Sequence, residues 1–241
     1  MLTSMLGRIL HSLDALIFDS GCMICGKHCD ASMHGICVEC RYNIPLTYYW
    51  HKEDNPVKEH FAGIVPVEQG SSFFFFREGS MWRRAIHQFK YGGRWKIARE
   101  LGRWYGVELK ESGLYDDVDV VIPVPLHPIK QLKRTYNQSA YVAEGIAKSM
   151  GVKVNYRAVR RIRNNPPQAN CNFTERWENV TSLFKVGDIK ALEGKHILLV
   201  DDVLTTGATL SSCAQAILNA VASCRISVAT LAVTEHVRGL K

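Results

Sequence analysis

The sequence predicts an α/β fold in which a parallel sheet is flanked by helices, with a small cysteine-rich module before it. Short apolar runs alternate with amphipathic segments through residues 61–236, an alternation typical of strands joined by crossover helices. Five of the eight cysteines lie in the short stretch CMICGKHCDASMHGICVEC, from Cys22 to Cys40. The 241 residues are enough for one α/β domain and a small appendage.

The first 21 residues favour an amphipathic helix over an export signal. Charged or polar side chains interrupt the hydrophobic run, while apolar residues recur at helical spacing: Leu6, Ile9, Leu10, Leu13 and Ile17. No stretch approaches the ~18–20 apolar residues of a membrane span. We therefore expect a cytoplasmic protein without a membrane span.

The clustered cysteines predict a structural metal site. Two CxxC pairs can each present two thiolates to one ion, and four thiolates suit tetrahedral zinc. The predicted ligands are Cys22, Cys25, Cys37 and Cys40, with His28, Cys29 and His34 as candidate replacements. Free thiols or a redox CxxC are the alternatives, although a redox site needs only one pair beside a βαβ unit.

The polar stretch that follows lacks periodicity and is typical of a linker. We expect the N-terminal helix and metal-binding module in residues 1–45, the linker in 46–60 and the α/β domain in 61–241. Strands are expected at 61–67, 71–76, 118–125, 152–159, 195–202 and 225–236. Helices are expected at 80–90, 94–110, 137–151 and 208–222, the third of them closed by Gly151.

The stretch HILLVDDVLTTGATL, residues 196–210, carries the strongest functional signal. A buried strand runs into Asp201 and Asp202, and ligands collect at the carboxyl ends of parallel strands. The following TTGAT precedes a helix, where unpaired N–H groups, hydroxyls and a glycine suit a phosphate. Two acids beside a phosphate indicate ribose hydroxyls or magnesium as their partners. The alternative, a turn with an aspartate cap, explains one acid and one threonine only.

Net charge is compatible with such a ligand but does not select it. The formal charge of +7 favours phosphorylated compounds or nucleic acid. A basic surface facing only solvent would have the same composition.

The segment ILLVDDVLTTGAT resembles the signature of type I phosphoribosyltransferases, enzymes that use phosphoribosyl pyrophosphate (PRPP). FKYGGRWKIARELG, VIPVPLHPIKQLKRTYNQ, RRIRNNPPQ and ERWENVTSLF are similar to segments of the ComF family. The resemblance covers nearly the whole chain and implies a type I phosphoribosyltransferase-like parallel sheet with a small N-terminal zinc-ribbon module. The chain differs in lacking a proline before its first cysteine pair. It also has RTYNQ where the family usually shows Arg-Gly-Phe-Asn.

The resemblance implies roles for individual residues. Asp201 and Asp202 would face the ribose hydroxyls of PRPP and stabilise charge during transfer. The 5-phosphate would lie against Thr205, Thr206, Gly207, Ala208 and Thr209, and the pyrophosphate loop would include Pro125, Leu126 and His127.

Two basic segments have an open interpretation. Lys130, Lys133 and Arg134 would neutralise pyrophosphate, or form a solvated helix start. Arg160, Arg161 and Arg163 precede a polar, proline-rich stretch in the place of a closing lid. Arg176 and Asn179 match a family pair without an assigned role.

The same resemblance implies that the protein binds PRPP with magnesium and serves DNA uptake in natural transformation. Catalysis with an unknown acceptor is one hypothesis. A non-catalytic adaptor that binds competence proteins or single-stranded DNA is another, and nucleobase salvage is a third.

Overall fold

The computed structural model describes residues 21–29, 35–126, 136–163, 183–234 and Val237. The chain divides into two compact units, Met1–Ile44 and Pro45–Lys241, which are described one at a time. The amphipathic helix expected near the N-terminus lies outside the described residues. Within them, no helix combines the length and the apolar character needed to cross a bilayer.

The first unit is built around its two CxxC turns. The backbone N–H of Cys22 donates to the carbonyl of Lys27 at 2.7 Å, and that of Met23 donates to Gly35 at 2.7 Å. A short helix, α2 (Val38–Tyr42), then begins with the Cys37 side chain accepting from the N–H of Cys40. These bonds bring the two cysteine pairs together.

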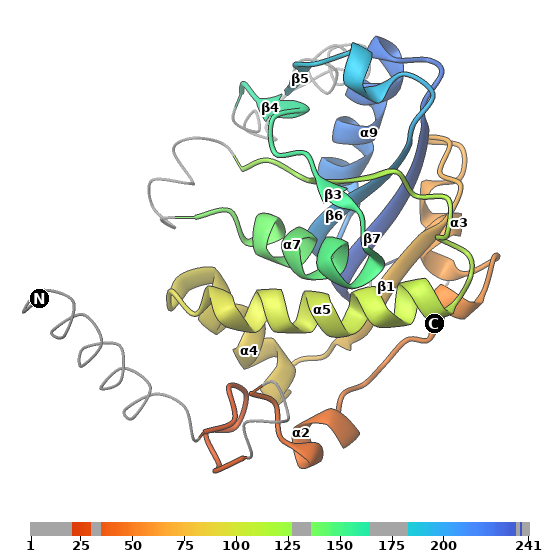
Figure 1. Ribbon diagram of the computed structural model, residues 1–241. Helices are drawn as coiled ribbons and strands as arrows, with labels where there is room; N and C mark the ends of the chain where they lie inside the picture. Colours follow the sequence, from red (N-terminus) through yellow and green to blue (C-terminus); the bar gives the residue numbers. More distant parts are fainter. Residues whose placement is uncertain (1–20, 30–34, 127–135, 164–182, 235–236, 238–241) are drawn as a thin grey trace, which may run out of the picture. The chain divides into compact units, whose positions relative to one another are not determined.

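The second unit contains a parallel sheet of five strands. Its order is β1 (Gly70–Phe76), β7 (Arg225–Thr234), β6 (His196–Leu204), β2 (Val120–Pro123) and β3 (Lys153–Val154). Strands β6 and β7 are therefore central, and their long apolar runs are covered on both faces. The carboxyl ends of β1, β7, β6 and β2 lie along one edge (Figure 1).

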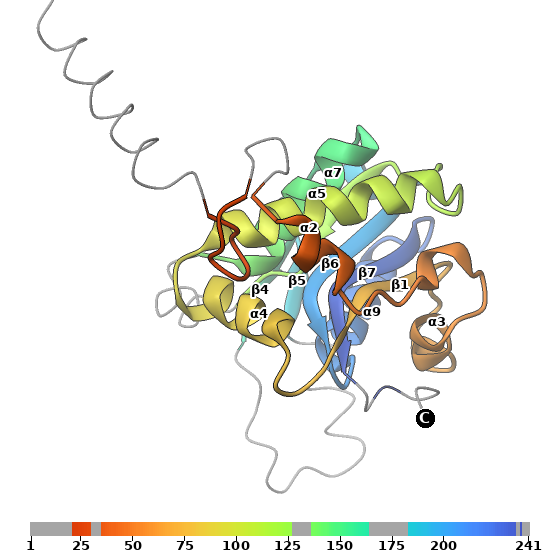
Figure 2. The same cartoon turned by 90° about the horizontal axis from the view of Figure 1, so that it is seen from below.

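Helices cover both faces of this sheet. Helices α5 (Trp95–Glu111) and α7 (Gln138–Met150) lie side by side on one face, and α9 (Ala208–Ala220) lies on the other (Figures 1 and 2). Helix α4 (Met81–Tyr91) precedes α5, and the Ser80 hydroxyl accepts from the Arg83 N–H at its start. The layered α/β fold expected from the sequence is confirmed.

Glycines allow α5 and α7 to pack with their backbones almost in contact. A Cβ on Gly145 would lie 2.2 Å from the Arg99 carbonyl oxygen, and one on Gly102 would lie 2.4 Å from that of Val142. Only glycine fits at such separations.

Residues 46–60, expected to form a linker, are instead part of the second unit. They include a 3₁₀ turn (Tyr49–His51) and most of helix α3 (Pro56–Phe61). Trp50 is fully buried, with its ring 5.6 Å from that of Phe73. The side chain of Asn55 accepts from two N–H groups and caps α3, so the polar composition conceals a helix start.

One strand prediction is wrong, and another is confirmed only in part. Residues 61–67 form the end of α3 and a turn, because the helix that begins at Asn55–Pro56 continues to Phe61. The strand expected at 152–159 ends early, at Val154. The Asn155 side chain that follows accepts hydrogen bonds from the N–H groups of Arg157 and Ala158 and turns the chain there. Further along, β4 (Val159–Arg161) pairs antiparallel with β5 (Phe184–Val186), which the sequence did not predict. A second 3₁₀ turn, Lys190–Leu192, precedes β6.

Candidate functional site

The acidic pair lies near the carboxyl end of β6, where two helices reach it. The Asp201 Oδ1 atom accepts from the Ser139 hydroxyl of α7 at 2.7 Å and from the Asp202 N–H at 2.9 Å. The Asp202 carboxylate pairs with the Lys90 ammonium of α4, with Nζ and Oδ1 3.0 Å apart. Each carboxylate is thus oriented by a different helix. Neither Ser139 nor Lys90 was predicted from the sequence.

This environment changes the acidity of Asp201. Burial and the neighbouring Asp202 charge raise the pKa of Asp201 to about 6, while Ser139, the Asp202 N–H and Lys90 act in the opposite direction. Asp201 therefore titrates closer to neutral pH than an ordinary aspartate does.

Arg161 is buried, close enough to Asp201 for the two charges to interact. Its guanidinium carbon lies 5.4 Å from the centre of the Phe184 ring. Burial lowers the pKa of Arg161, and the charge of Asp201 opposes that change. The neighbouring Arg160 and Arg163 are exposed. The proline-rich stretch expected as a lid, with Arg176 and Asn179, lies outside the described residues.

The turn between β6 and α9 presents unpaired amides at the same edge of the sheet. Among the described residues, none accepts a hydrogen bond from the backbone N–H groups of Thr205 to Thr209. These residues line a shallow depression together with Asp201. A row of free N–H groups at a helix start can hold an anion such as phosphate.

Gly207 is required in this turn for two reasons. Its φ is +69°, in the left-handed region that glycine adopts without strain. A Cβ at this position would lie 2.6 Å from Nε2 of His60, which also lies 3.1 Å from the Thr206 carbonyl oxygen. His60 of α3 therefore supports the turn. From the sequence, His60 was expected in a linker and without a functional role.

The end of β2 adjoins the acidic pair. The Val124 N–H donates to the Val200 carbonyl at 2.8 Å, and the Asn137 side chain donates to the Val124 carbonyl at 3.0 Å. Pro125 and Leu126 follow directly. The other residues expected here, His127, Lys130, Lys133 and Arg134, lie outside the described residues.

In the first unit, four thiols form a compact group. The Sγ atoms of Cys22, Cys25, Cys37 and Cys40 all lie within 4.8 Å of one another. The Cys22–Cys40 and Cys25–Cys37 Sγ pairs are each 3.7 Å apart, close to the edge of about 3.8 Å that a tetrahedron with zinc–sulfur bonds of ~2.3 Å requires. The donor set therefore fits a zinc ion.

Two backbone N–H groups lie against the sulfur of Cys22 and favour its thiolate. The N–H groups of Ile24 and Cys37 each lie 3.4 Å from the Cys22 sulfur. Burial alone would raise the pKa of Cys22, but backbone N–H groups outweigh it and lower the pKa to about 6. His28 and Cys29 are not in the four-thiol group, and His34 lies outside the described residues.

A second polar cluster lies at the opposite end of β6 but already contains a cation. Glu68, Asp117 and His196 converge there. The Arg225 guanidinium pairs with Glu68 at 2.9 Å and with Asp117 at 2.8 Å. The cluster is therefore a network of ion pairs within the protein.

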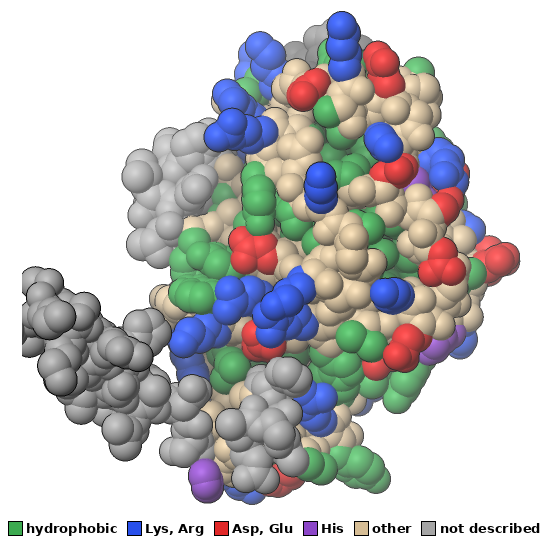
Figure 3. Space-filling view, in the orientation of Figure 1, with side chains coloured by type: hydrophobic (Ala, Val, Ile, Leu, Met, Phe, Trp, Pro, Cys, Tyr) green, Lys and Arg blue, Asp and Glu red, His purple; other side chains and the backbone are tan. Residues whose placement is uncertain are grey.

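Basic side chains also gather over α5 on the face shown in Figure 3. On this helix the Arg99 guanidinium carbon lies 4.7 Å from the centre of the Trp95 ring. The same ring stacks on Tyr141 of α7 at 4.9 Å. This surface combines positive charge with aromatic rings.

Comparison with known proteins identifies one domain and several relatives. A family model described as "Phosphoribosyl transferase domain" matches residues 137–240. "DNA utilization protein YhgH" of Escherichia coli O6:H1 is 31% identical over 137 residues, which are 55% of this chain and 59% of that protein. The chain thus spans less than two thirds of the YhgH proteins it matches.

Two longer matches extend over most of the chain. "Competence protein F" of Haemophilus influenzae is 25% identical over 80% of this chain and 89% of its own length. "Competence protein ComFC" of Bacillus subtilis is 25% identical over 87% of this chain and 76% of its own length. Among solved structures, a glutamine PRPP amidotransferase of B. subtilis has a TM-score of 0.41 and 18% identity, over 59% of this chain and 30% of its own.

Proposed function

This chain is a relative of competence proteins F and ComFC and carries a phosphoribosyltransferase domain, and we propose its function on that basis. It binds PRPP together with magnesium at the carboxyl end of β6, and it serves the uptake or use of DNA. The names of the relatives support the second part. The cytoplasm is the expected compartment, because thiolate metal sites persist where cysteines stay reduced.

One observation carries the PRPP assignment: at the carboxyl end of β6, the two carboxylates lie next to a turn whose amides have no acceptor among the described residues. The unpaired N–H groups of residues 205–209 would hold the 5-phosphate, with Thr205, Thr206 and Thr209 as further donors. Asp201 and Asp202 would accept from the ribose hydroxyls. Lys90 reduces the repulsion between Asp202 and an anionic ligand.

Pyrophosphate would lie toward the end of β2. Pro125 and Leu126 adjoin the acids there, since Val124 is bonded to Val200 of β6. His127 and Arg134, from the sequence analysis, would complete this subsite. Magnesium would neutralise the phosphate oxygens of the ligand, and carboxylates are suitable ligands for it.

Zinc would have a structural role. The four cysteines supply all four positions of a tetrahedral site, so none remains open for chemistry.

Catalysis would require a nucleophilic acceptor. A lone pair of the acceptor would form a bond to the anomeric carbon while the carbon–oxygen bond to pyrophosphate breaks. The electrons of that bond would leave with pyrophosphate, and the acceptor proton would pass to water. The charges of Asp201 and Asp202 would stabilise the positive ribosyl centre.

A non-catalytic adaptor is a second candidate, favoured by the α5 surface. Basic side chains gather there, Arg99 among them, and single-stranded nucleic acid binds basic surfaces through its phosphate charge. PRPP would then be a regulatory ligand.

Calorimetry with PRPP and magnesium tests the binding site. Thr206→Val removes a hydroxyl donor without changing the side-chain shape greatly, and we expect weaker binding by about 10-fold. Substituting Gly207 is a less specific test, because a Cβ would meet His60. Ser211→Ala, one turn further along α9, is the matched control. Equal PRPP affinity in the parent and Thr206→Val would contradict the phosphate assignment.

Pyrophosphate release separates the two candidates. In the variant Asp201→Asn/Asp202→Asn, a catalyst would retain PRPP binding and lose release by about 100-fold or more. An adaptor would release no pyrophosphate in either form. Full transformation by this double variant in a deletion strain would exclude a catalytic role in cells.

A further inference from the structure

We infer that a groove along α4 binds a phosphorylated compound with a planar ring, of about mononucleotide size, and that this compound is the acceptor for the PRPP site. The acceptor role rests on the function proposed above. Binding in the groove rests on its own geometry.

The groove lies beside the acidic pair and has the size of a ligand site. Its volume is about 620 Å³, within the range of small-molecule pockets. It begins at Phe76, which pairs with Thr234 at the carboxyl ends of β1 and β7. It extends along α4 to Lys90, whose ammonium reaches Asp202 of β6. The groove thus crosses the edge of the sheet that carries the proposed PRPP site.

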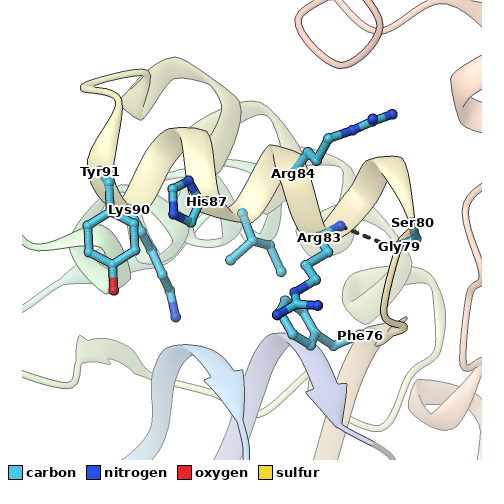
Figure 4. Close-up of a pocket in the computed structure, with 9 residues that line it drawn as sticks. Phe76, Gly79, Ser80, Arg83, Arg84, His87, Lys90 and Tyr91 are labelled. Atoms are coloured by element: carbon cyan, nitrogen blue, oxygen red, sulfur yellow. Dashed lines mark hydrogen bonds between the residues drawn. The ribbon is translucent and has the colours of Figure 1, made fainter.

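Charged side chains lie at the two ends of the groove. Figure 4 shows Arg83 and Lys90 pointing from α4 toward the strand ends, with His87 between them. These residues are spaced at four and three positions, so they share one face of the helix. Seven residues of helix span ~10 Å, about the length of a mononucleotide.

Arg83 is available to an anionic ligand. Its only acidic partner among the described residues is Glu78, at 3.1 Å, whose side chain is 91% exposed. An ion pair so exposed is weak, and a phosphate can replace it with two parallel hydrogen bonds. Lys90, in contrast, already forms an ion pair with Asp202.

Ring surfaces lie next to these charges. The Arg83 guanidinium carbon is 5.7 Å from the centre of the Phe76 ring. At the other end, the rings of His87 and Tyr91 are 4.7 Å apart, and Tyr91 is 61% exposed. The groove thus has a guanidinium at one end and exposed rings at the other, which suits a planar group that carries a phosphate.

The end of α4 near the acids is fixed in place. The Gln138 side chain donates to the Lys90 carbonyl at 3.3 Å, and the Tyr136 hydroxyl donates to the Phe89 carbonyl. A compound with its phosphate at Arg83 would therefore extend its other end toward Lys90 and the ribose site. There, its lone pair would attack the anomeric carbon in the balanced step given above.

The test uses adenosine monophosphate, adenosine and inorganic phosphate, each titrated into the full-length protein by calorimetry. Saturating PRPP and magnesium occupy the phosphate turn, so that the probe cannot bind there. We expect the monophosphate to bind at least 10-fold more tightly than adenosine or phosphate alone. Arg83→Ala should weaken it by 10-fold or more, and Glu78→Gln should leave it equal or tighter. Lys110→Ala, which removes a similar charge at the far end of α5, is the control.

Several outcomes overturn the inference. They are equal binding of adenosine and its monophosphate, equal binding by the parent and Arg83→Ala, and a comparable loss in Lys110→Ala. PRPP affinity is measured separately in the parent and in Arg83→Ala. If the parent does not bind PRPP but binds the monophosphate through Arg83, the acceptor role is excluded and the groove remains a binding site. If the parent binds PRPP but not the monophosphate, the groove is not a binding site and the proposed function is unaffected.

Discussion

At the scale of single residues, the acidic pair is held in a costly arrangement. Asp201 and Asp202 are neighbours in one strand. Among the described residues, Lys90 pairs with Asp202 at 3.0 Å, and the Ser139 hydroxyl and the Asp202 N–H donate to Asp201 at 2.7 Å and 2.9 Å. Such an arrangement lowers stability unless a ligand uses it. Replacing one of these acids by a neutral residue should therefore raise the free energy of unfolding.

Asp201→Asn should stabilise the protein at pH 8. The pKa of Asp201 is raised to about 6 by burial and by Asp202, so ionisation of this group lowers the free energy of unfolding as pH rises from about 4 through about 6. Asparagine keeps the Ser139 acceptor and removes the charge. We expect a gain of about 1–2 kcal/mol at pH 8, seen as a higher melting temperature.

The pH dependence provides the control for this effect. At pH 4 the parent carboxyl is protonated in the folded state, so the gain in melting temperature should shrink toward zero. A gain that is equal at pH 4 and pH 8, or a loss at pH 8, would contradict a raised pKa at Asp201.

At the scale of elements, the contact between α5 and α7 determines where Ser139 lies. Gly102, Gly106 and Gly145 allow the two helices to approach at backbone distance. Ser139 is at the start of α7, so a shift of this helix would move the donor to Asp201.

Gly145→Ala should lower the melting temperature strongly. A Cβ there would meet the Arg99 carbonyl oxygen at 2.2 Å, and backbone cannot yield as a flexible side chain can. We expect a loss of about 3 kcal/mol or more, the range of severe overpacking, measured by thermal or urea unfolding. Lys148→Ala, exposed on the same helix, should change stability by less than about 0.5 kcal/mol. Similar stability of both variants would show that the helices separate easily.

The elements also show what sequence could and could not predict. Buried strands such as β6 and β7 were predictable, because parallel strands covered on both faces are continuous apolar runs. Helices α4, α5, α7 and α9 were predictable from their periodicity. The early end of β3 was not, since it depends on hydrogen bonds of the Asn155 side chain.

Local pattern identified the acids and the turn, but not the groups that come from other elements. His60 and Lys90 reach the site across long sequence separations, and neither has a distinctive local pattern. Asn55–Pro56 is a typical helix start, but the polar residues around it made the segment resemble a linker. Gly102 and Gly106 show a four-residue spacing that indicates close helix packing only once the partner helix is known.

At the scale of the whole molecule, the chain combines an α/β unit that has a large core with a small unit that depends on four thiols. Few apolar residues are buried among the described residues of Met1–Ile44. Small modules of this kind commonly need a metal to fold.

We expect one zinc ion per chain in protein prepared under reducing conditions. Cys37→Ser should abolish stoichiometric zinc, since three ligands do not close a structural site, and chelation should unfold the first unit. Zinc contributes roughly 10 kcal/mol or more to such modules. Metal analysis by mass spectrometry measures the stoichiometry.

Cys29→Ser is the matched control for the zinc site. Cys29 lies near the four-thiol group in sequence but is not part of it, so this variant should keep one zinc per chain. Loss of zinc in Cys29→Ser, or zinc well below one per chain in the parent, would contradict the assigned ligands.

The central position of β6 has a consequence for hydrogen exchange. Strand β6 is bonded on both sides, to β2 and β7, so the amides of residues 197–200 should exchange with deuterium only when the whole unit unfolds. The amides of residues 205–209 have no acceptor among the described residues and should exchange within seconds. Within this part of the described chain, very slow and very fast amides would thus be separated by a few residues. Adding PRPP and magnesium should slow exchange at 205–209 alone, and mass spectrometry of peptides spanning 196–212 would detect it.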